Sequence, residues 1–379
     1  MIFMASHAVR RLRFHWSIPA SGGVDVTRGA TARAQTSGLP DIDVHIAFCR
    51  LAENAGMDSV LVPIGYYRAD PVTMAAAMGA ATSTLKFMLA SRTGIVAPTY
   101  FVQQVNTVSA VTDGRVSINS VAGHSPDEQR FFGDPVAHDE RYRRADEFWT
   151  ICRAMWGDDH PTTFAGRYYR IDGARPGMPF VSAERSRPEI YISGNSAEAE
   201  QVAIKHADCH LRFADAPDRL TPRITPVLAS GTEVGLVLSM IVRPTRAEAL
   251  RAAEELIERA GEKAREVQRR FLARSDSVGF ATTHAMAEKE SWLTPYLWIG
   301  AVPYMGPPSI SLVGTPEDVA EGLLEFGRIG ISQFIFQGRP DIDVMTAFGR
   351  DVLPLVRARE SAKSATPEKK PARQEAERQ

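Results

Sequence analysis

The sequence has 379 residues, of which 44% are hydrophobic and 23% are charged, and its formal net charge is -1. A chain of this length can bury a large core, and it lacks the basic excess of a nucleic-acid-binding protein. No apolar run is long enough to cross a bilayer, and the first fifteen residues lack a long apolar segment with a small-residue cleavage site. We therefore expect a cytoplasmic protein whose partner is a small molecule, with no nucleic-acid or membrane partner.

Three cysteines, Cys49, Cys152 and Cys209, are scattered through the chain. Their odd number and their helix-like or strand-end contexts argue against a disulfide framework and favour buried thiols. The stretch HADCH at 206–210 places two histidines beside Cys209, but it supplies no fourth ligand. We therefore predict no metal site.

Strand-like and helix-like patterns alternate along most of the chain. The strand-like runs are apolar almost throughout, which is typical of a parallel sheet covered on both faces. Eight such units predict a (β/α)8 TIM barrel, an α/β fold. A doubly wound open sheet is the alternative, but no GxGxxG motif follows an early strand to support it. The predicted strands are 12–18, 58–64, 85–92, 114–121, 189–194, 209–214, 233–242 and 331–338, and the helical patterns include 41–56, 71–82, 98–112, 197–206, 245–263, 315–329 and 342–358.

Two insertions interrupt this alternation inside a single domain, 11–358. Residues 157–188 contain TTFAGRYYRI, which predicts a small hairpin with Ala-Gly at its turn. Residues 264–310 are too long for an ordinary connection and contain Gly and Pro clusters and several aromatics. This second insertion is either a lid over the site or a static helical packing element. We expect 1–10 to be a flexible N-terminus and 359–379 to be a disordered charged tail.

In a barrel of this kind, the loops after the strands build the site. After the fifth predicted strand, Ser193, Gly194, Asn195 and Ser196 lead directly into a helix. Unpaired amides at a helix start, with serine hydroxyls and a glycine that permits close approach, can hold a phosphate group. Serine and asparagine are also the preferred N-caps of any helix, so this pattern alone leaves both interpretations open.

Asn119, at the end of the fourth predicted strand, precedes a polar loop and a long amphipathic helix that begins near His138. A strand end and the following helix start are neighbours in a βα unit, and His138 and Tyr142 share one helix face because they stand four residues apart. This order predicts that Asn119, His138 and Tyr142 lie near one place. The alternative is a polar crossover loop whose aromatic side chain only packs.

Several motifs together resemble one family of enzymes. They are RFHWSIP, NAGMDSVLVPIG, LKFMLASRTGIVAPT, GRVSINSVAGHSPDEQRFFGD, IYISGNS, RSDSVG and SLVGTPEDVAEGLLEFGRIGISQFIF, and they span about residues 12 to 358. The chain resembles the luciferase-like flavin-dependent monooxygenases, and within them it is most similar to the alkanesulfonate monooxygenase branch. The resemblance implies a barrel that binds reduced FMN from a separate reductase and uses O2 to oxygenate an organic substrate.

The resemblance also implies cofactor-binding residues. It places Asn119, His138 and Tyr142 around the flavin ribityl chain and phosphate, and Gly194, Asn195 and Ser196 on the phosphate itself. FMN also needs a mostly apolar wall for its ring, which we assign to the strand residues 62–64 and 90. The cofactor-binding set is therefore Val62, Ala90, Asn119, His138, Tyr142, Ser193, Gly194, Asn195 and Ser196.

The chain departs from the alkanesulfonate branch at the residues that recognise the sulfonate. That branch carries a Cys after strand two, an Arg and a His on strand seven, a Tyr and a His after strand eight, and an Arg in the mobile insertion. A buried sulfonate without cationic partners is strongly disfavoured, so we do not predict an alkanesulfonate substrate. This chain has instead Arg68, Val237 and Ser239, Arg339 and Asp341, and PYMGPP at 303–308.

The replacements suggest another kind of substrate. Arg68, Arg92 and Arg339 could face the barrel mouth and bind a carboxylate or a phosphopantetheine-like anion. The alternative is that Arg68 and Arg339 pair with Asp70 and Asp341 at the rim. Trp16, Tyr66, Tyr67 and Tyr304 could shape an apolar compartment or simply pack. Our candidate catalytic residues are Trp16, Arg92, Ser239 and Arg339, and our candidate substrate-binding residues are Tyr66, Arg68 and Tyr304.

We predict a two-component FMNH2-dependent monooxygenase that inserts one oxygen atom from O2 into a small organic or carrier-tethered metabolite. Its partner would be an NAD(P)H-dependent flavin reductase, and the family resemblance implies a homodimer or homotetramer. One alternative is a deazaflavin-dependent oxidoreductase on the same barrel. Another is a flavin-binding protein that no longer catalyses a reaction.

Overall fold

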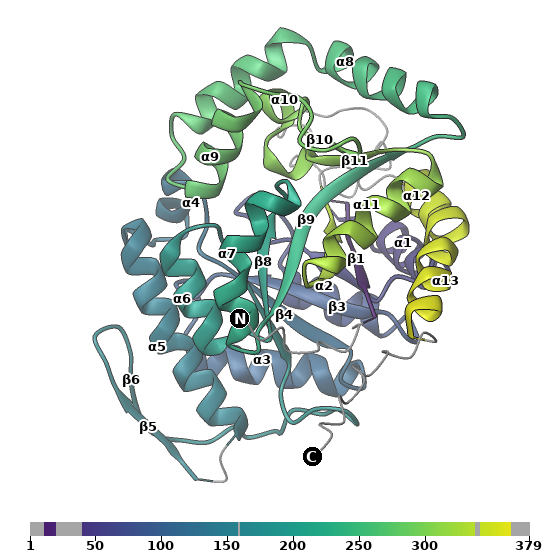
Figure 1. Cartoon of the computed structure of the whole chain (residues 1–379). Coiled ribbons are helices and arrows are strands. Elements are labelled where there is room, and N and C mark those ends of the chain that lie inside the picture. Colours follow the sequence, from purple (N-terminus) through teal and green to yellow (C-terminus); the bar gives the residue numbers. More distant parts are fainter. Residues whose placement is uncertain (1–10, 20–39, 158–159, 338–341, 365–379) are drawn as a thin grey trace, which may run out of the picture.

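The computed structural model describes residues 11–19, 40–157, 160–337 and 342–364 (Figure 1). Eight parallel strands form a closed barrel, in which β12 pairs with β1 and β8 pairs with β9 to complete the ring. The predicted (β/α)8 TIM barrel is confirmed. In ring order the strands are β1 (Arg13–Ser17), β2 (Ser59–Val62), β3 (Lys86–Ser91), β4 (Val116–Val121), β7 (Glu189–Ser193), β8 (Cys209–Phe213), β9 (Glu233–Val242) and β12 (Ile331–Phe336).

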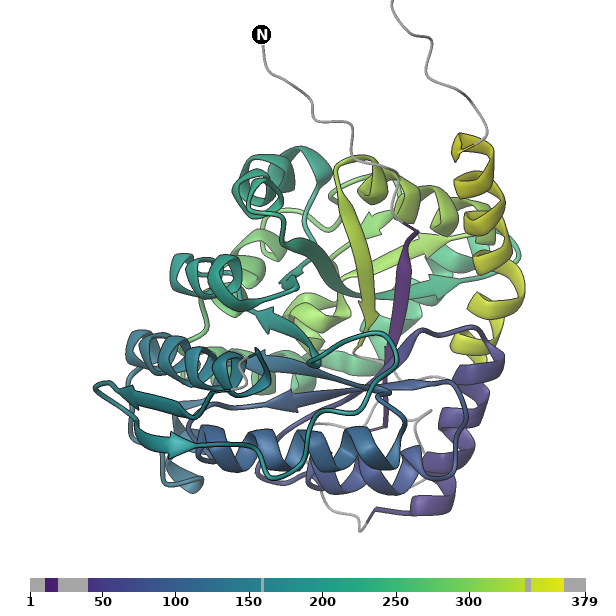
Figure 2. The same cartoon turned by 90° about the horizontal axis from the view of Figure 1, so that it is seen from below.

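Helices between the strands form a layer around the barrel, which Figure 2 shows from below. Several begin with a side-chain cap; Thr315, for example, makes a capping box with Asp318 at the start of α11. These helices are α1 (Ile42–Asn54), α2 (Pro71–Gly79), α3 (Pro98–Val111), α4 (Pro126–Phe131), α5 (His138–Gly157), α6 (Ala197–His206), α7 (Pro217–Ala229), α11 (Pro316–Arg328), α12 (Ile342–Ala347), the π-helix η2 (Phe348–Val352) and α13 (Leu353–Ser364). Among the described helices, none combines the length and apolarity needed to span a bilayer.

The helix α7 was not predicted, because it contains Pro222 and Pro226. Both prolines lie on its exposed face, where water can bind the backbone carbonyls that lose an amide partner. Its other face buries Leu220, Ile224 and Val227 against the barrel, and this helical spacing was masked by the prolines.

Side chains of the barrel strands alternate between two apolar clusters. On each strand, alternate positions face inward: Leu61 and Val237 belong to a small cluster inside the barrel, whereas their neighbours Val60, Val62 and Leu236 belong to the large cluster shared with the helices. The interior cluster is completed by Met88, Ala90, Tyr191, Cys209, Leu211 and Ile335, with Ile64 and Phe213 packed against it.

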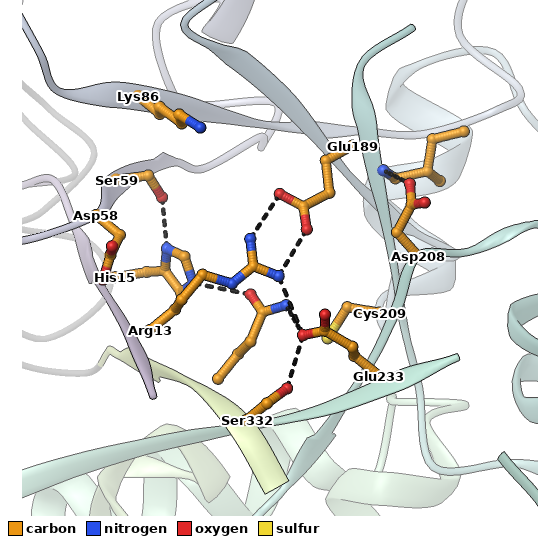
Figure 3. Close-up of polar contacts among 12 residues, drawn as sticks. Arg13, His15, Asp58, Ser59, Lys86, Glu189, Asp208, Cys209, Glu233 and Ser332 are labelled. Atoms are coloured by element: carbon orange, nitrogen blue, oxygen red, sulfur yellow. Dashed lines mark hydrogen bonds and ion pairs between the residues drawn. The ribbon is translucent and has the colours of Figure 1, made fainter. Parts of the chain in front are cut away.

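A polar network closes the end of the barrel where the strands begin (Figure 3). Arg13 on β1 donates to both oxygens of Glu189 on β7, at 3.0 and 2.7 Å, and to Glu233 on β9 at 3.0 Å. His15 lies 2.7 Å from the Ser59 hydroxyl and 3.0 Å from the Gln333 amide oxygen. The network joins several strands across the barrel, and in a barrel of this kind such a cluster serves stability.

The strand β9 is longer than its barrel neighbours and leads into the second insertion. Its last four residues pair with β11 (Ser311–Gly314), which pairs in turn with β10 (Leu297–Trp298). These two short strands were not predicted. The helix α8 (Arg246–Leu272) precedes and enters the insertion; it is kinked at Gly261 and runs nine residues beyond its predicted end. The insertion also contains α9 (Val278–Ala287), α10 (Val302–Met305) and the 3-10 helix η1 (Pro307–Ser309).

The first insertion forms the predicted hairpin. Its strands β5 (Thr162–Ala165) and β6 (Arg170–Ala174) pair antiparallel, and the Gly166 amide donates to the Tyr169 carbonyl at the turn. The hairpin stands outside the helical layer in Figure 2.

The predicted start of the disordered tail at residue 359 is wrong. The helix α13 continues to Ser364 because its last turns are held by Arg359, which pairs with Glu321 at 2.8 Å, and by Glu360, which accepts from the Leu12 amide at 2.7 Å. The predicted flexible 1–10 segment and the rest of the tail lie outside the described residues.

Candidate active site

The loops that follow the barrel strands lie at the end covered by α8, α9 and α10 (Figure 1). The strand β9 is followed directly by α8, so the same end of the barrel carries both the loops and their cover. The predicted site residues can therefore be placed relative to the barrel interior, the helical layer and the insertion.

The turn between β7 and α6 has the features of an anion cradle. Ser196 caps α6 by accepting from the Ala199 amide at 3.2 Å, and Tyr142 from α5 makes a side-chain hydrogen bond to Ser196. Gly194 has φ +152°, and a Cβ there would lie 2.5 Å from the Ala199 Cβ and 2.8 Å from the Tyr142 hydroxyl oxygen. Within the described parts of the chain, the amides at 195–198 have no hydrogen-bond acceptor. A glycine, free amides and hydroxyls converge here, as an oxyanion requires.

Two side chains beside this cradle point into the barrel. The Ser193 hydroxyl donates to the Asn119 side-chain oxygen at 2.7 Å, which joins β7 to β4. Behind the turn, a ring nitrogen of His210 lies 2.8 Å from the Gly194 carbonyl oxygen. Burial lowers the pKa of His210 to about 3, so its ring is neutral and can donate to this carbonyl.

His138 and Tyr142 share a face of α5, as predicted. Their ring centroids are 5.3 Å apart in an edge-on arrangement, and the His138 ring lies 3.0 Å from the Asp139 carboxylate. Burial raises the pKa of Tyr142 to about 12, so its phenol keeps its proton and remains a donor. The structure thus brings Tyr142 and the 193–196 turn together, with His138 behind Tyr142 and Asn119 on the Ser193 side.

The structure divides the residues predicted for the flavin wall between the two apolar clusters. Ala90 and Ile64 belong to the interior apolar cluster. Val62 belongs to the outer cluster instead, because it has the opposite strand parity to Leu61. Phe213, at the end of β8, also packs against the interior cluster, and no sequence pattern singled it out.

The structure places Trp16, one of the predicted catalytic residues, outside the interior cluster of the barrel. Trp16 is buried in the helical layer, where its ring centroid lies 5.1 Å from that of Phe336 and 6.4 Å from that of Phe348. Its neighbour His15 occupies the inward-facing position of β1 and contacts Tyr191. Trp16 therefore packs helices on the barrel and is removed from the candidate catalytic set.

Arg92 lies at the end of β3 and is almost fully buried. Its Nη2 pairs with Glu128 from α4 at 2.5 Å, and its guanidinium lies over the Phe132 ring at 5.3 Å. Burial alone would raise the pKa of Glu128, but Arg92 and the amide of Tyr66 outweigh burial and lower it. Glu128 is therefore a carboxylate that joins the loops after β2, β3 and β4, and the sequence analysis did not identify it.

The remaining candidates lie around the mouth or away from it. Tyr66 is 48% exposed at the rim and stacks edge-on with Tyr67. Tyr304 on α10 packs beneath the Arg265 guanidinium of α8, whose central carbon lies 5.9 Å from the centre of the Tyr304 ring. This contact agrees with the alternative that Tyr304 only packs. Ser239 is buried where β9 meets the insertion, and its amide donates to the Ile310 carbonyl. Arg339 and Asp341 lie outside the described residues.

The insertion is tied to the barrel at the loop after β4. The buried guanidinium of Arg141 pairs with Asp276 in the turn between α8 and α9, and it also donates to the Ala122 carbonyl at 3.0 Å. The Ser275 hydroxyl donates to the His124 carbonyl at 2.8 Å. His124 belongs to the GHSPDE motif, and Ser275 and Asp276 belong to the RSDSVG motif. The spacing of these motifs in the chain gives no sign of their contact.

An aromatic wall lines the same junction. The His124 ring stacks on Phe280 at 5.2 Å and meets Phe271 edge-on at 5.2 Å. Burial lowers the pKa of His124 to about 4, so this ring is neutral near pH 7. The insertion therefore contributes side chains to the mouth itself.

The family model for luciferase-like monooxygenases matches residues 12–333 of the chain. This match covers most of the closed barrel and both insertions. The chain belongs to the luciferase-like monooxygenase family, and it is an oxidoreductase of the flavin-dependent monooxygenase class.

Solved structures with the same fold include three that differ in their chemistry. EDTA monooxygenase (EmoA) from Chelativorans sp. BNC1 has a TM-score of 0.73 at 17% identity, over 92% of this chain and 94% of that chain. Riboflavin lyase (RcaE), with modified FMN and riboflavin, has a TM-score of 0.69 at 18% identity, over 92% of each chain. An F420-dependent secondary alcohol dehydrogenase, with an F420-acetone adduct, has a TM-score of 0.63 at 18% identity, over 92% of this chain and 99% of that chain. At these identities the likeness is one of fold.

Proposed function

We propose that the chain is the oxygenating component of a two-component FMNH2-dependent monooxygenase. The observation that carries the proposal is the cradle between β7 and α6. Gly194 leaves room for a ligand oxygen, the amides at 195–198 have no acceptor among the described residues, and the Tyr142 phenol is held at the same turn. These donors fit the terminal phosphate of FMN.

The protein's own part in the reaction is to bind, orient and exclude water. Asn119 and Ser193 offer polar groups toward the barrel axis, where a ribityl chain could bind, and Ala90, Ile64 and Phe213 offer an apolar wall for a ring. When bound, reduced FMN activates O2 and delivers one oxygen atom to the substrate. The insertion keeps solvent away from the mouth through the Arg141–Asp276 pair and the wall of His124, Phe271 and Phe280.

The remaining elements of the proposal concern the reductase, the substrate and the assembly. The reduced flavin would come from an NAD(P)H-dependent flavin reductase, and the substrate would be a small organic or carrier-tethered metabolite. We propose a cytoplasmic homodimer or homotetramer. The resemblance to the alkanesulfonate branch implies that its substrate-site residues correspond to Arg68, Val237 and Ser239 in this chain, so we do not propose an alkanesulfonate as substrate.

Anaerobic titration of the chain with reduced FMN tests the cofactor, with reduced F420 as the comparison. We expect saturable binding of reduced FMN and weaker binding of F420. Admission of O2 should then give slow hydrogen peroxide release, which falls when an accepted substrate captures the oxygen. Binding of F420 alone would favour the deazaflavin-dependent oxidoreductase. F420 is the cofactor of one neighbour with the same fold, a secondary alcohol dehydrogenase. Tight FMNH2 binding with no substrate that lowers the peroxide yield would favour a non-catalytic flavoprotein.

A further inference from the structure

The barrel mouth contains more positive than negative charge. Arg92 is 5% exposed and uses only Nη2 for its ion pair, while its buried Nε and Nη1 have no partner. Glu128, the carboxylate of this pair, also accepts from the Tyr66 amide at 2.7 Å. One carboxylate is therefore shared between an arginine and a backbone amide, and it cannot fully compensate a second cation.

That second cation is Arg68. It follows Tyr67 in the loop after β2, and its side-chain carbons lie against Gly65, beside Glu128. Among the described residues it makes no ion pair, and Asp70, its expected rim partner, instead caps α2 by accepting from the Thr73 amide at 2.8 Å. Burial lowers the pKa of Arg68 and Arg92 lowers it further, although Glu128 opposes both. The two guanidiniums therefore repel each other in a partly desolvated place.

The other ionisable groups nearby do not supply the missing negative charge. His124 is neutral, since burial lowers its pKa to about 4. The Asp276 carboxylate is held by Arg141. Arg68 and Arg92 thus face Glu128 alone, which leaves an excess of one positive charge among the described groups. A buried charge without a partner is costly, and an anionic ligand would remove that cost.

A cavity of about 320 Å³ beside the mouth is also surrounded by more positive than negative charge. It adjoins the aromatic wall, because Phe271 from that wall also lines the cavity. Two further arginines line it, Arg270 in the last turn of α8 and Arg274 just after this helix. Two carboxylates nearby are already engaged, Asp127 with Arg130 and Glu266 with Arg269 and Arg270. An anion approaching from this side meets a positive potential. The cavity is lined by Ser125, Asp127, Arg270, Phe271 and Arg274.

We propose that the substrate carries a carboxylate or phosphate group and that Arg68 binds this group at the barrel mouth. Arg68 is only partly buried, so its planar fork can reach a ligand oxyanion and bind two of its oxygens. Arg92 is a positioning residue, which holds Glu128 away from Arg68 and adds charge from behind. The inference names the substrate class of the proposed monooxygenase and in that sense rests on the proposed function.

Three aryl probes of similar shape test the inference without a known substrate. Benzoate and phenyl phosphate carry the two candidate anions, and benzamide is a neutral counterpart. Their dissociation constants are measured by isothermal titration calorimetry on the full chain, in the wild type, in Arg68→Gln and in Arg68→Lys. Arg130→Gln is the matched control, because Arg130 on α4 is also an arginine near the mouth but is 63% exposed and paired with Asp127.

We expect Arg68→Gln to weaken at least one anionic probe by roughly tenfold, and Arg68→Lys to weaken it less. Arg130→Gln should leave both anions unaffected, and benzamide should bind weakly to every variant. The probe that responds identifies carboxylate or phosphate. Phenyl phosphate held at the 193–196 cradle would respond to Ser196→Ala and not to Arg68→Gln.

Equal anion affinity in the wild type and Arg68→Gln would overturn the inference, as would benzamide binding as tightly as benzoate. Loss of Arg68 leaves Glu128 with Arg92 and the Tyr66 amide, so the variant should fold, and its thermal midpoint checks this. Reduced-FMN titration of the same variants separates the two claims. Failure of FMN binding with an Arg68-dependent anion site would reject the monooxygenase proposal and keep the anion site.

Discussion

The phenol of Tyr142 is the most specific single contact at the cradle. It is buried, it bonds to Ser196, and its oxygen would clash with any side chain at residue 194. We expect Tyr142→Phe to weaken FMN binding by about 1 to 3 kcal/mol, because one donor to a charged phosphate is lost. Flavin fluorescence quenching measures this affinity.

Tyr168→Phe is the control for Tyr142→Phe. Tyr168 lies in the hairpin insertion, outside the barrel, and its hydroxyl donates to Glu140 on α5. The same kind of hydroxyl group is removed there, and FMN affinity should not change. If Tyr142→Phe also binds FMN as the wild type does, Tyr142 does not contact the phosphate.

His210 predicts a pH dependence of folding. Burial lowers its pKa from 6.5 to about 3. Between these two pH values His210 is protonated in the unfolded chain but neutral in the folded chain. Stability from this group is present above the unfolded pKa and is lost as pH falls below it. At pH 5 the loss would reach at most about 2 kcal/mol.

The variant His210→Asn removes this titration. Urea unfolding at several pH values between about 5 and 7 should show a free energy of unfolding that falls less steeply on acidification in the variant than in the wild type. Parallel pH profiles would mean that His210 is protonated equally in both states.

The turn between α8 and α9 is the element whose attachment matters most for the mouth. Asp276 pairs with Arg141, which is only 2% exposed, and the adjacent Arg274 is an exposed trypsin site. Asp276→Asn leaves the buried Arg141 without its counter-ion. We expect tryptic cleavage after Arg274 to become roughly 5- to 30-fold faster, because local opening costs less free energy.

Asp172→Asn in the exposed hairpin is the control, since it removes an acidic charge from a distant strand. Bound FMN should slow cleavage of the wild type if the insertion closes over the flavin. Equal rates with and without FMN would favour the alternative that the insertion is a static packing element.

The elements themselves show which patterns were readable in the sequence. The eight barrel strands were predicted because they are short apolar runs bounded by turns. The face of each strand was harder, since both faces are buried and the usual alternation is weak. In β1 the signal was present: Arg13, His15 and Ser17 alternate with Phe14 and Trp16, and the polar positions face inward. Applying that parity would have kept Trp16 and Val62 out of the site.

Other features could not be predicted from local patterns. The pairs Arg92–Glu128 and Arg141–Asp276 join residues 36 and 135 positions apart, so only the folded chain brings them together. The strands β10 and β11 are very short and depend on the end of β9 for pairing. The cradle was predictable, because a helix start after a barrel strand has free amides whatever its side chains are.

The whole barrel is held at its closed end by the network around Arg13. This arginine stands between Glu189 and Glu233, whose side chains are 8% and 21% exposed. Arg13→Met leaves two partly buried carboxylates without their shared cation. We expect the free energy of unfolding to fall by about 2 to 3 kcal/mol, less than for a fully buried pair.

Because this network lies at the opposite end from the cradle, FMN affinity of folded Arg13→Met should be unchanged. Arg350→Met is the comparison, since its pair with Asp351 is exposed and should contribute far less to stability than the Arg13 network. Similar losses in the two variants would show that the network does not close the barrel.

The central proposal is that the protein binds the phosphate of reduced FMN at the turn between β7 and α6. The most direct test is anaerobic titration with reduced FMN and with reduced riboflavin, which differ only in that phosphate. We predict that FMN binds about 10- to 100-fold more tightly, as expected for charge-assisted hydrogen bonds to an oxyanion. Equal affinity for the two flavins, or no binding of either, would contradict the account.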